Sequence, residues 1–247
     1  MLRYFSFVKS GKEWLKSKEK RSFDILFSSA ASTLAAPLGM AALTAVMIEN
    51  RHMPIFRQER VGNPESELWV PKLRILAGPI EHRPSQNGHN HTRAAGKLSR
   101  LVRKMHLDET PQFGLVLAGK MSVVGPRPIV KPEFEEIMDS LDPSGQAEWL
   151  MARRISKPGL VNGLSPAQHI PGYENSPQEV AAADIAYTQN ASWDEDKRII
   201  LETTRSVITD LFSRRAASSS MNYDETALQS DHEVPVQPQV IIGEAAE

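Results

Sequence analysis

The longest apolar stretch of the chain runs from Ile25 to Ile48 and contains no charged residue. A helix needs roughly 20 apolar residues to cross the hydrocarbon core of a bilayer, so this stretch is long enough. Pro37 lies at its centre, and a proline inside a helix removes one backbone hydrogen bond and clashes with the preceding turn. The pattern therefore predicts an apolar helix that is bent or broken at Pro37.

Basic residues flank the apolar stretch on both sides; they are Lys18, Lys20 and Arg21 before it and Arg51, Arg57 and Arg60 after it. A simple span would place one of these clusters on the outer face of the membrane, against the positive-inside tendency. We therefore predict a re-entrant helix hairpin over residues 22–50, which breaks at Pro37 and returns to the same face. A true span and a buried helix of a soluble core are the alternatives.

The preceding segment, residues 1–21, is a basic lead-in in which apolar side chains such as Trp14 and Leu15 lie among lysines. This amphipathic pattern is typical of a helix that rests on anionic lipid headgroups. The alternative is a frayed, solvated N-terminus. We predict contact with membrane lipids.

Residues 51–212 have the pattern of a mixed α/β domain. Two short strands, Ile55–Gln58 and Leu68–Val70, are predicted around turn residues at 62–64. Apolar periodicity predicts helices over 97–104, 112–118 and 194–212. Residues 213–247 are rich in Ser, Ala, Gln, Pro and acids, and are predicted to be disordered. The predicted fold class is thus α/β, mostly helical with short strands, with the hairpin packed on a small domain.

Composition narrows the chemistry. The formal net charge of the 247 residues is −1, so no global field points to nucleic acid as a partner. There is no cysteine, which excludes disulfides, thiolate zinc sites, iron–sulfur clusters and cysteine nucleophiles.

Candidate chemistry lies in the segment 103–128. Asp108 and Glu109 precede Pro111, which is typical of the first residue of a helix with Thr110 as its N-cap. Carboxylates are favoured beside the positive end of a helix, so plain capping alone explains this pair.

Basic residues around the acids favour a functional interpretation. Arg103 precedes them, and Arg127 lies between two prolines after a glycine. An arginine held in such a rigid turn loses little entropy when it binds phosphate, and its planar fork suits bidentate contact. One carboxylate could attack phosphorus while the other holds Mg²⁺, which matches the needs of diphosphate chemistry.

A set of motifs in fixed order extends this pattern from Lys20 to about Thr204. They are Lys20-Arg21-Ser22-Phe23-Asp24, Pro37, Phe56 to Gly62, Lys72-Leu73-Arg74, Leu107-Asp108-Glu109 with Pro111-Gln112, Met121 to Pro128, and finally Asp184, Tyr187, Asn190, Ser192 and Asp196. The sequence resembles the bacterial sugar transferase family, the monotopic phosphoglycosyl transferases that start glycan assembly on undecaprenyl phosphate.

The resemblance implies a phosphoglycosyl transferase that moves a sugar 1-phosphate from a UDP-sugar to polyprenol phosphate. Asp108 would attack the sugar-bearing phosphate, release UMP and form a phosphosugar–aspartate intermediate, which polyprenol phosphate would then attack. Glu109, together with Asp108, would bind Mg²⁺, and Arg103 and Arg127 would hold phosphate groups. The product would initiate exopolysaccharide, capsule, O-antigen or glycoprotein glycan synthesis.

The resemblance also implies a location. The apolar segment would dip into the cytoplasmic leaflet of the bacterial inner membrane as a re-entrant hairpin, with Arg21, Asp24 and Pro37 as its characteristic residues. The domain 51–212 would then lie on the cytoplasmic face.

The sequence departs from the family pattern at several positions. Lys120 replaces an acid, Thr110 replaces a leucine, and Ile75-Leu76 replaces Thr-Met. The segment Pro158–His169 keeps its Pro-Gly but lacks the family's tryptophan and arginine. Because that segment is expected to contact the nucleotide sugar, the sugar stays unpredicted.

Two other functions fit parts of the pattern. A non-catalytic, membrane-associated relative acting as scaffold or regulator is favoured by the altered Pro158–His169 segment and disfavoured by the intact Asp108-Glu109 pair. A soluble α/β phosphotransferase is the other, with the stretch from Ile25 to Ile48 as its core helix.

Overall fold

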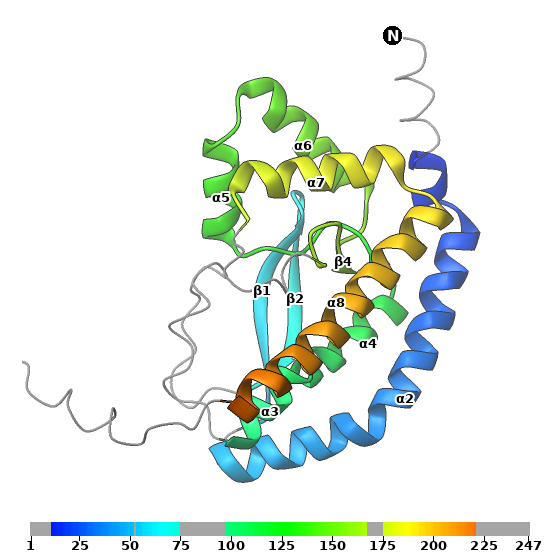
Figure 1. The fold of residues 1–247 in the computed structure, drawn as a ribbon. Helices are drawn as coiled ribbons and strands as arrows, with labels where there is room; N and C mark the ends of the chain where they lie inside the picture. The colour runs from blue at the N-terminus through cyan, green and yellow to red at the C-terminus, as the bar shows by residue number, and fades with distance from the viewer. Residues whose placement is uncertain (1–10, 52, 75–96, 167–174, 221–247) are drawn as a thin grey trace, which may run out of the picture. The chain divides into compact units, whose positions relative to one another are not determined.

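The computed structural model describes residues 11–51, 53–74, 97–166 and 175–220 (Figure 1). A short helix over residues 11–15 comes first. The elements that follow are α2 Lys18–Asn50, β1 Ile55–Asn63, β2 Ser66–Leu73, α3 Lys97–Lys104, η2 Leu107–Gln112, α4 Phe113–Leu117, β3 Ser122–Val124, α5 Lys131–Asp139, α6 Pro143–Ile155, β4 Gly159–Val161, α7 Pro177–Asn190 and α8 Trp193–Ser220. The chain divides into two compact units, Met1–Leu211 and Phe212–Glu247. The mixed, mostly helical α/β class is confirmed.

Helix α2 is continuous through Pro37. It begins after Ser17, whose hydroxyl accepts a hydrogen bond from the Lys20 amide at 3.0 Å. It ends at Arg51, which adopts a left-handed conformation and donates its amide hydrogen to the Met47 carbonyl at 3.1 Å. The ribbon bends about half-way along its length (Figure 1). The predicted bend is therefore present without a break in the helix, and the re-entrant hairpin stays a prediction.

The apolar surface of α2 is largely exposed. The segment Lys18–Glu49 is long enough and apolar enough to cross a membrane, with a mean hydropathy of 1.7 over its most apolar window, of which 11% is buried. Its most exposed apolar side chains are Leu26, Leu34, Met40 and Ile48, at 64–79%. A core helix of a soluble protein buries such side chains. The exposure therefore favours a helix that contacts lipid.

Strands β1 and β2 form an antiparallel hairpin that is longer than predicted, with its turn at residues 64–65. Phe56 pairs with Lys72 at the open end, so Lys72 lies far from the turn. Strands β3 and β4 form a small parallel sheet that the sequence pattern did not indicate. A Cβ on Gly159 would lie 2.2 Å from the backbone nitrogen of Gly125, so only glycine permits this approach.

Three hydrophobic clusters hold the described part of the chain together. The central one joins β2, β3, α4, α7 and α8, and the third joins α5, α6 and α7. The second contains Ala42 and Val46 of α2, Leu73 of β2 and Val102 of α3. The second half of α2 is thus packed against the open end of the hairpin.

A buried ion network fixes the first half of α2. Lys20 lies 2.9 Å from Asp196 of α8 and 3.4 Å from Asp24 one turn on, and all three side chains are at most 4% exposed. Asp24 also accepts hydrogen bonds of 3.0 Å from the Ser122 hydroxyl and the Val123 amide.

Arg21 makes a second attachment. Its guanidinium donates to the carbonyls of Val116 and Leu117 at 2.7 and 2.8 Å, at the carboxyl end of α4. A cation is favoured there because the last carbonyls of a helix carry partial negative charge. Arg21 and Asp24, predicted as characteristic residues of the membrane segment, therefore join α2 to the rest of the fold.

The remaining predicted helices have mixed outcomes. The predicted bounds 97–104 coincide with α3, and α8 extends the predicted 194–212 to Ser220, into the segment expected to be disordered. The predicted helix 112–118 is α4 preceded by the 3-10 turn η2. Thr110 as N-cap is wrong: its hydroxyl donates to the Leu107 carbonyl at 2.8 Å, because the turn already begins at Leu107. The predicted lead-in likewise ends earlier, since α2 starts at Lys18.

Candidate active site

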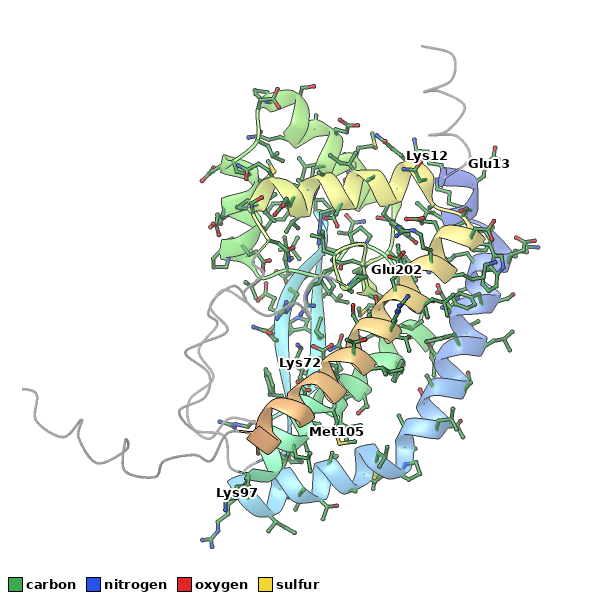
Figure 2. All side chains as sticks on the ribbon, viewed as in Figure 1. Lys12, Glu13, Lys72, Lys97, Met105 and Glu202 are labelled. Atoms are coloured by element: carbon green, nitrogen blue, oxygen red, sulfur yellow. The ribbon has the colours of Figure 1, made fainter. Side chains whose placement is uncertain are left out.

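The two predicted catalytic acids lie in the first turn of η2, beside the open end of the hairpin. Glu109 accepts a hydrogen bond from the Lys72 ammonium, with 2.7 Å between Nζ and Oε1. The side chain of Lys72 is 16% exposed and that of Glu109 34%, so the pair is reachable from solvent. Figure 2 shows Lys72 on the β1–β2 hairpin. The residue carrying the proposed nucleophile is half-buried beside this ion pair.

The two acids have opposite electrostatic environments. Burial and, secondly, the neighbouring charge of Glu109 raise the pKa of Asp108 to about 6, against the lowering effect of Lys72. Burial alone would raise the pKa of Glu109 as well, but Lys72 and Arg127 outweigh it and lower that pKa to about 2. At neutral pH Glu109 is therefore held as a paired carboxylate. Asp108 is ionised at neutral pH but its charge is poorly stabilised.

Arg127 belongs to the same site. It follows β3 in the Pro-Arg-Pro turn and acts electrostatically on Glu109. The buried Arg60 of β1 supports this turn by donating to the Pro128 carbonyl at 2.9 Å. Burial and the charge of Arg127 lower the pKa of Arg60 to about 10.

Glu133, in the first turn of α5, faces the two arginines. Burial raises its pKa, while Arg127 and Arg60 act in the opposite direction. Its Oε2 atom is buried and has no hydrogen-bond partner among the described residues. Arg127 and Arg60 thus interact electrostatically with acids on two elements, Glu109 of η2 and Glu133 of α5.

Other predicted site residues are placed less fully. Arg103 lies in α3, and its side chain is outside the part of the structure described here. His106 precedes η2 in a left-handed conformation, with φ of 53°, and its charge lowers the pKa of both acids. Of the altered segment Pro158–His169, residues 158–166 are described; they form β4 and a turn closed by Asn162 and Ser165.

The membrane-competent helix passes next to the acids. A Cβ on Gly39, two residues after Pro37, would lie 3.4 Å from the Thr110 hydroxyl oxygen. Thr110 directly follows Glu109 in η2. The exposed side chains of Leu34, Leu38 and Met40 therefore lie on the helix that touches the turn carrying both acids.

Asp108 and Glu109 are the residues of this site that could hold a magnesium ion. Among the described residues there is no group of three or more His, Asp or Glu side chains able to form a protein-only metal site. Mg²⁺ commonly binds through one or two carboxylates and completes its shell with water and substrate phosphates. Two adjacent carboxylates, one of which has a poorly stabilised charge, suit that mode.

Comparison with known proteins identifies the relatives of the chain. The family model described as bacterial sugar transferase matches residues 15–210. The chain belongs to the bacterial sugar transferase family. The match covers α2 and every described element of the candidate site.

Curated relatives in this family have named activities. The UDP-N-acetylgalactosamine-undecaprenyl-phosphate N-acetylgalactosaminephosphotransferase of Aeromonas hydrophila is 29% identical over 79% of this chain and 45% of its own length. The UDP-glucose:undecaprenyl-phosphate glucose-1-phosphate transferase of Caulobacter vibrioides is 31% identical over 77% of this chain and 70% of its own. The exopolysaccharide production protein ExoY of Rhizobium meliloti is 30% identical, over 76% and 84%. The chain thus spans less than half of the Aeromonas relative.

Sequence reasoning missed three members of the site. Lys72 and Arg60 stood in motifs but received no role at the site, and the sequence pattern did not single out Glu133. The available signal was weak: a lysine at a strand end points to a site only once its distant carboxylate partner is known. Asp108, Glu109 and Arg127 were predicted as site residues because they lie together in one dense motif.

Proposed function

We propose that the chain is a UDP-sugar:polyprenol-phosphate sugar-1-phosphate transferase that works at the membrane surface. The observation that carries this proposal is the contact between Gly39 of the exposed apolar helix and Thr110 of the turn that holds Asp108 and Glu109. A reaction between a soluble nucleotide sugar and a lipid phosphate needs its reactive group at the boundary between membrane and water. The names of the relatives supply the substrate classes.

In the first step, an oxygen of the Asp108 carboxylate attacks the sugar-bearing phosphorus of the UDP-sugar. A new O–P bond forms, the bond from that phosphorus to the bridging oxygen breaks, and UMP leaves with the electron pair. The carboxylate must be ionised to attack, and a pKa of about 6 permits this at neutral pH. The surroundings of Asp108 stabilise this negative charge poorly.

In the second step, a phosphate oxygen of polyprenol phosphate attacks the same phosphorus. The Asp108–phosphorus bond breaks, giving a polyprenol diphosphate sugar and the free carboxylate. Because the two substrates react in turn, the soluble and the lipid substrate never need to occupy the site together.

The remaining residues bind and orient phosphate. Arg127 and Lys72 present cationic donors beside the acids, and Glu109 holds Lys72 in place. Asp108 and Glu109 are the carboxylates that would hold Mg²⁺, which when bound neutralises charge on the diphosphate. We place the enzyme on the cytoplasmic face of the bacterial inner membrane, at the start of exopolysaccharide or a related glycan, with the sugar left open.

The test is product analysis. Membranes containing the full chain are incubated with a panel of UDP-sugars, polyprenol phosphate and Mg²⁺, and the released nucleotide is identified. UMP is expected from wild type, none from Asp108→Asn, and an unchanged amount from Asp139→Asn, which removes an exposed acid of α5. Release of UDP would contradict the chemistry. Absence of UMP with every donor, with a cellular phenotype unaffected by Asp108→Asn, would favour the scaffold.

A further inference from the structure

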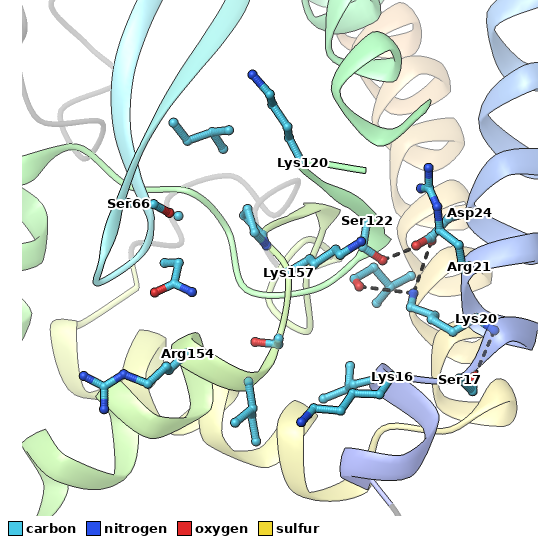
Figure 3. Close-up of a pocket in the computed structure, with 18 of the residues that line it drawn as sticks. Lys16, Ser17, Lys20, Arg21, Asp24, Ser66, Lys120, Ser122, Arg154 and Lys157 are labelled. Carbon is cyan, nitrogen blue, oxygen red and sulfur yellow. Dashed lines mark hydrogen bonds and ion pairs between the residues drawn. The ribbon is translucent and has the colours of Figure 1, made fainter. Parts of the chain in front are cut away.

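A cavity lies at the N-terminal end of α2 (Figure 3). Its volume is about 660 Å³, within the usual range of small-molecule sites. We call it the basic cavity, defined by Lys16, Arg21, Lys120, Arg154 and Lys157 in its lining. These residues come from the loop before α2, α2 itself, the loop before β3, the end of α6 and the loop between α6 and β4. Distant parts of the sequence therefore converge on one positively charged cavity.

The positive charge of the basic cavity is largely uncompensated. Asp24 provides the one carboxylate in the lining. This carboxylate already accepts hydrogen bonds from Lys20, Ser122 and Val123. Within the described part of the chain, the ammonium groups of Lys16, Lys120 and Lys157 form no hydrogen bond or ion pair.

The guanidinium of Arg154 is only weakly paired. Arg154 reaches Glu65 at 2.7 Å, but the two side chains are 47% and 64% exposed, and such surface pairs contribute little. Its guanidinium therefore remains available to a ligand in the cavity.

Two of the cations point at the same place. Arg21 Nη2 and Lys157 Nζ lie 3.5 and 3.9 Å from the position that a Cβ on Gly119 would take. Gly119 has a φ of 77°, which favours glycine and leaves this space open. Arg21 is fixed by its bonds to the α4 carbonyls, so an anion bound between the two groups would interact favourably with both cations.

The start of α2 adds to this potential. Ser17, its N-cap, also lines the cavity, and α2 is 33 residues long. The N-terminal amides of a long helix attract anions, phosphate in particular. A phosphate group, with several oxygens around one centre, matches cations arriving from several directions better than a single carboxylate does.

The basic cavity is distinct from the active site. It lies at the turn end of the hairpin, where Asn63 and Ser66 line it, whereas Lys72 lies at the open end. A strand rises by about 3.3 Å per residue, so the six steps from Ser66 to Lys72 separate the two sites by roughly 20 Å. Neither Asp108 nor Glu109 lines the cavity. A nucleotide sugar positioned for attack by Asp108 does not fill it.

We propose that the basic cavity binds a second phosphate-bearing ligand, separate from the substrates at Asp108. The ligand is a phosphate ester or diphosphate, supplied by a soluble compound or by the headgroup of an anionic phospholipid. This assignment goes beyond the proposed transferase function and does not depend on it.

Site-resolved lysine labelling tests the assignment. The full chain is placed in nanodiscs of neutral phosphatidylcholine and acetylated with acetic anhydride, and the labelling of Lys120 and Lys157 is compared with that of exposed Lys131 by mass spectrometry. One arm adds inorganic pyrophosphate, and the other replaces part of the lipid by phosphatidylglycerol. Labelling of Lys120 and Lys157 is expected to fall severalfold relative to Lys131 in at least one arm.

Each outcome is decisive. Protection by pyrophosphate supports a soluble ligand, and protection only with phosphatidylglycerol supports a headgroup. Protection in neither arm, or equal protection of Lys131, overturns the proposal. Lys120→Gln/Lys157→Gln should weaken ligand protection of Lys16 by at least tenfold, since each lysine supplies a charge-assisted hydrogen bond. The control Lys197→Gln/Arg205→Gln removes two charges elsewhere and should leave it unchanged.

Discussion

Replacing Asp108 by asparagine is expected to make the folded protein more stable while it removes the proposed nucleophile. The pKa of this carboxyl rises from 3.8 to about 6 on folding, chiefly because the group is buried and Glu109 is adjacent. A raised carboxyl pKa means that the folded chain binds the proton more tightly than the unfolded chain. The associated stability is present below pH 4 and is lost as the pH rises through 6.

The magnitude follows from the shift. Each pKa unit corresponds to about 1.4 kcal/mol, so ionising Asp108 in the folded state costs at most about 3 kcal/mol. Asparagine has nearly the same shape and no charge, so Asp108→Asn avoids that cost above pH 6. For a domain of this size, about 3 kcal/mol corresponds to a melting temperature higher by roughly 6–12 °C.

The assay is thermal unfolding of the full chain in one detergent from pH 4 to pH 8. The melting temperature of Asp108→Asn should match that of wild type near pH 4 and exceed it increasingly up to pH 7. Glu109→Gln is the matched control with the opposite sign. The pKa of Glu109 is lowered to about 2 by Lys72 and Arg127, so losing its charge should destabilise the protein at pH 8.

A difference between Asp108→Asn and wild type that does not change with pH would refute the electrostatic reasoning. So would a lower melting temperature of Asp108→Asn at pH 8. Either result would mean that the carboxylate of Asp108 is stabilised in the folded protein by its surroundings.

Four further outcomes are expected. UMP release should decline as the pH falls below about 6, because protonation of Asp108 removes the nucleophile; a profile flat to pH 5 would contradict this. Lys72→Met should slow UMP release by roughly 100-fold and Lys72→Arg by much less, because Glu109 loses its partner; equal rates would exclude this role. Lys20→Met should destabilise the fold by about 3–5 kcal/mol, measured by melting, since it leaves two buried carboxylates short of a cation, whereas exposed Lys18→Met should not. Gly39→Ala should keep the rate of UMP release, because its Cβ would lie at an ordinary 3.4 Å from the Thr110 hydroxyl oxygen. Gly39→Phe should reduce that rate. An unchanged rate in Gly39→Phe would show that the packing of α2 against the η2 turn does not affect the reaction.

Local patterns predicted the elements whose signal lies in a few consecutive residues. Helix α3 has an amphipathic pattern over its full length, and the hairpin has alternating strands around turn residues. Helices α6 and α7 were missed although Asp142-Pro143 and the capping box of Ser176 and Glu179 mark their starts. Strands β3 and β4 span three residues each and pair across more than 30 positions, so no local pattern identifies them.

The candidate site likewise contains residues that a local pattern predicted and residues that it did not. Asp108, Glu109 and Arg127 lie within 20 positions of one another and were predicted from that density. Lys72 reaches Glu109 from 37 positions away, and Glu133 acquires its role only through burial beside Arg127. Such roles depend on tertiary packing and desolvation. A single sequence contains no local signal of either.

The buried network of Lys20, Asp24 and Asp196 has a consequence for the modularity of the protein. Deleting α2 would leave Asp196 in the interior without its cation, and would also remove the guanidinium of Arg21 from the end of α4. The apolar helix is therefore part of the same folding unit as the elements that it contacts. A fragment that lacks α2 is therefore expected to fold poorly, because it loses the Lys20–Asp196 ion pair and the hydrogen bonds that Arg21 donates to α4.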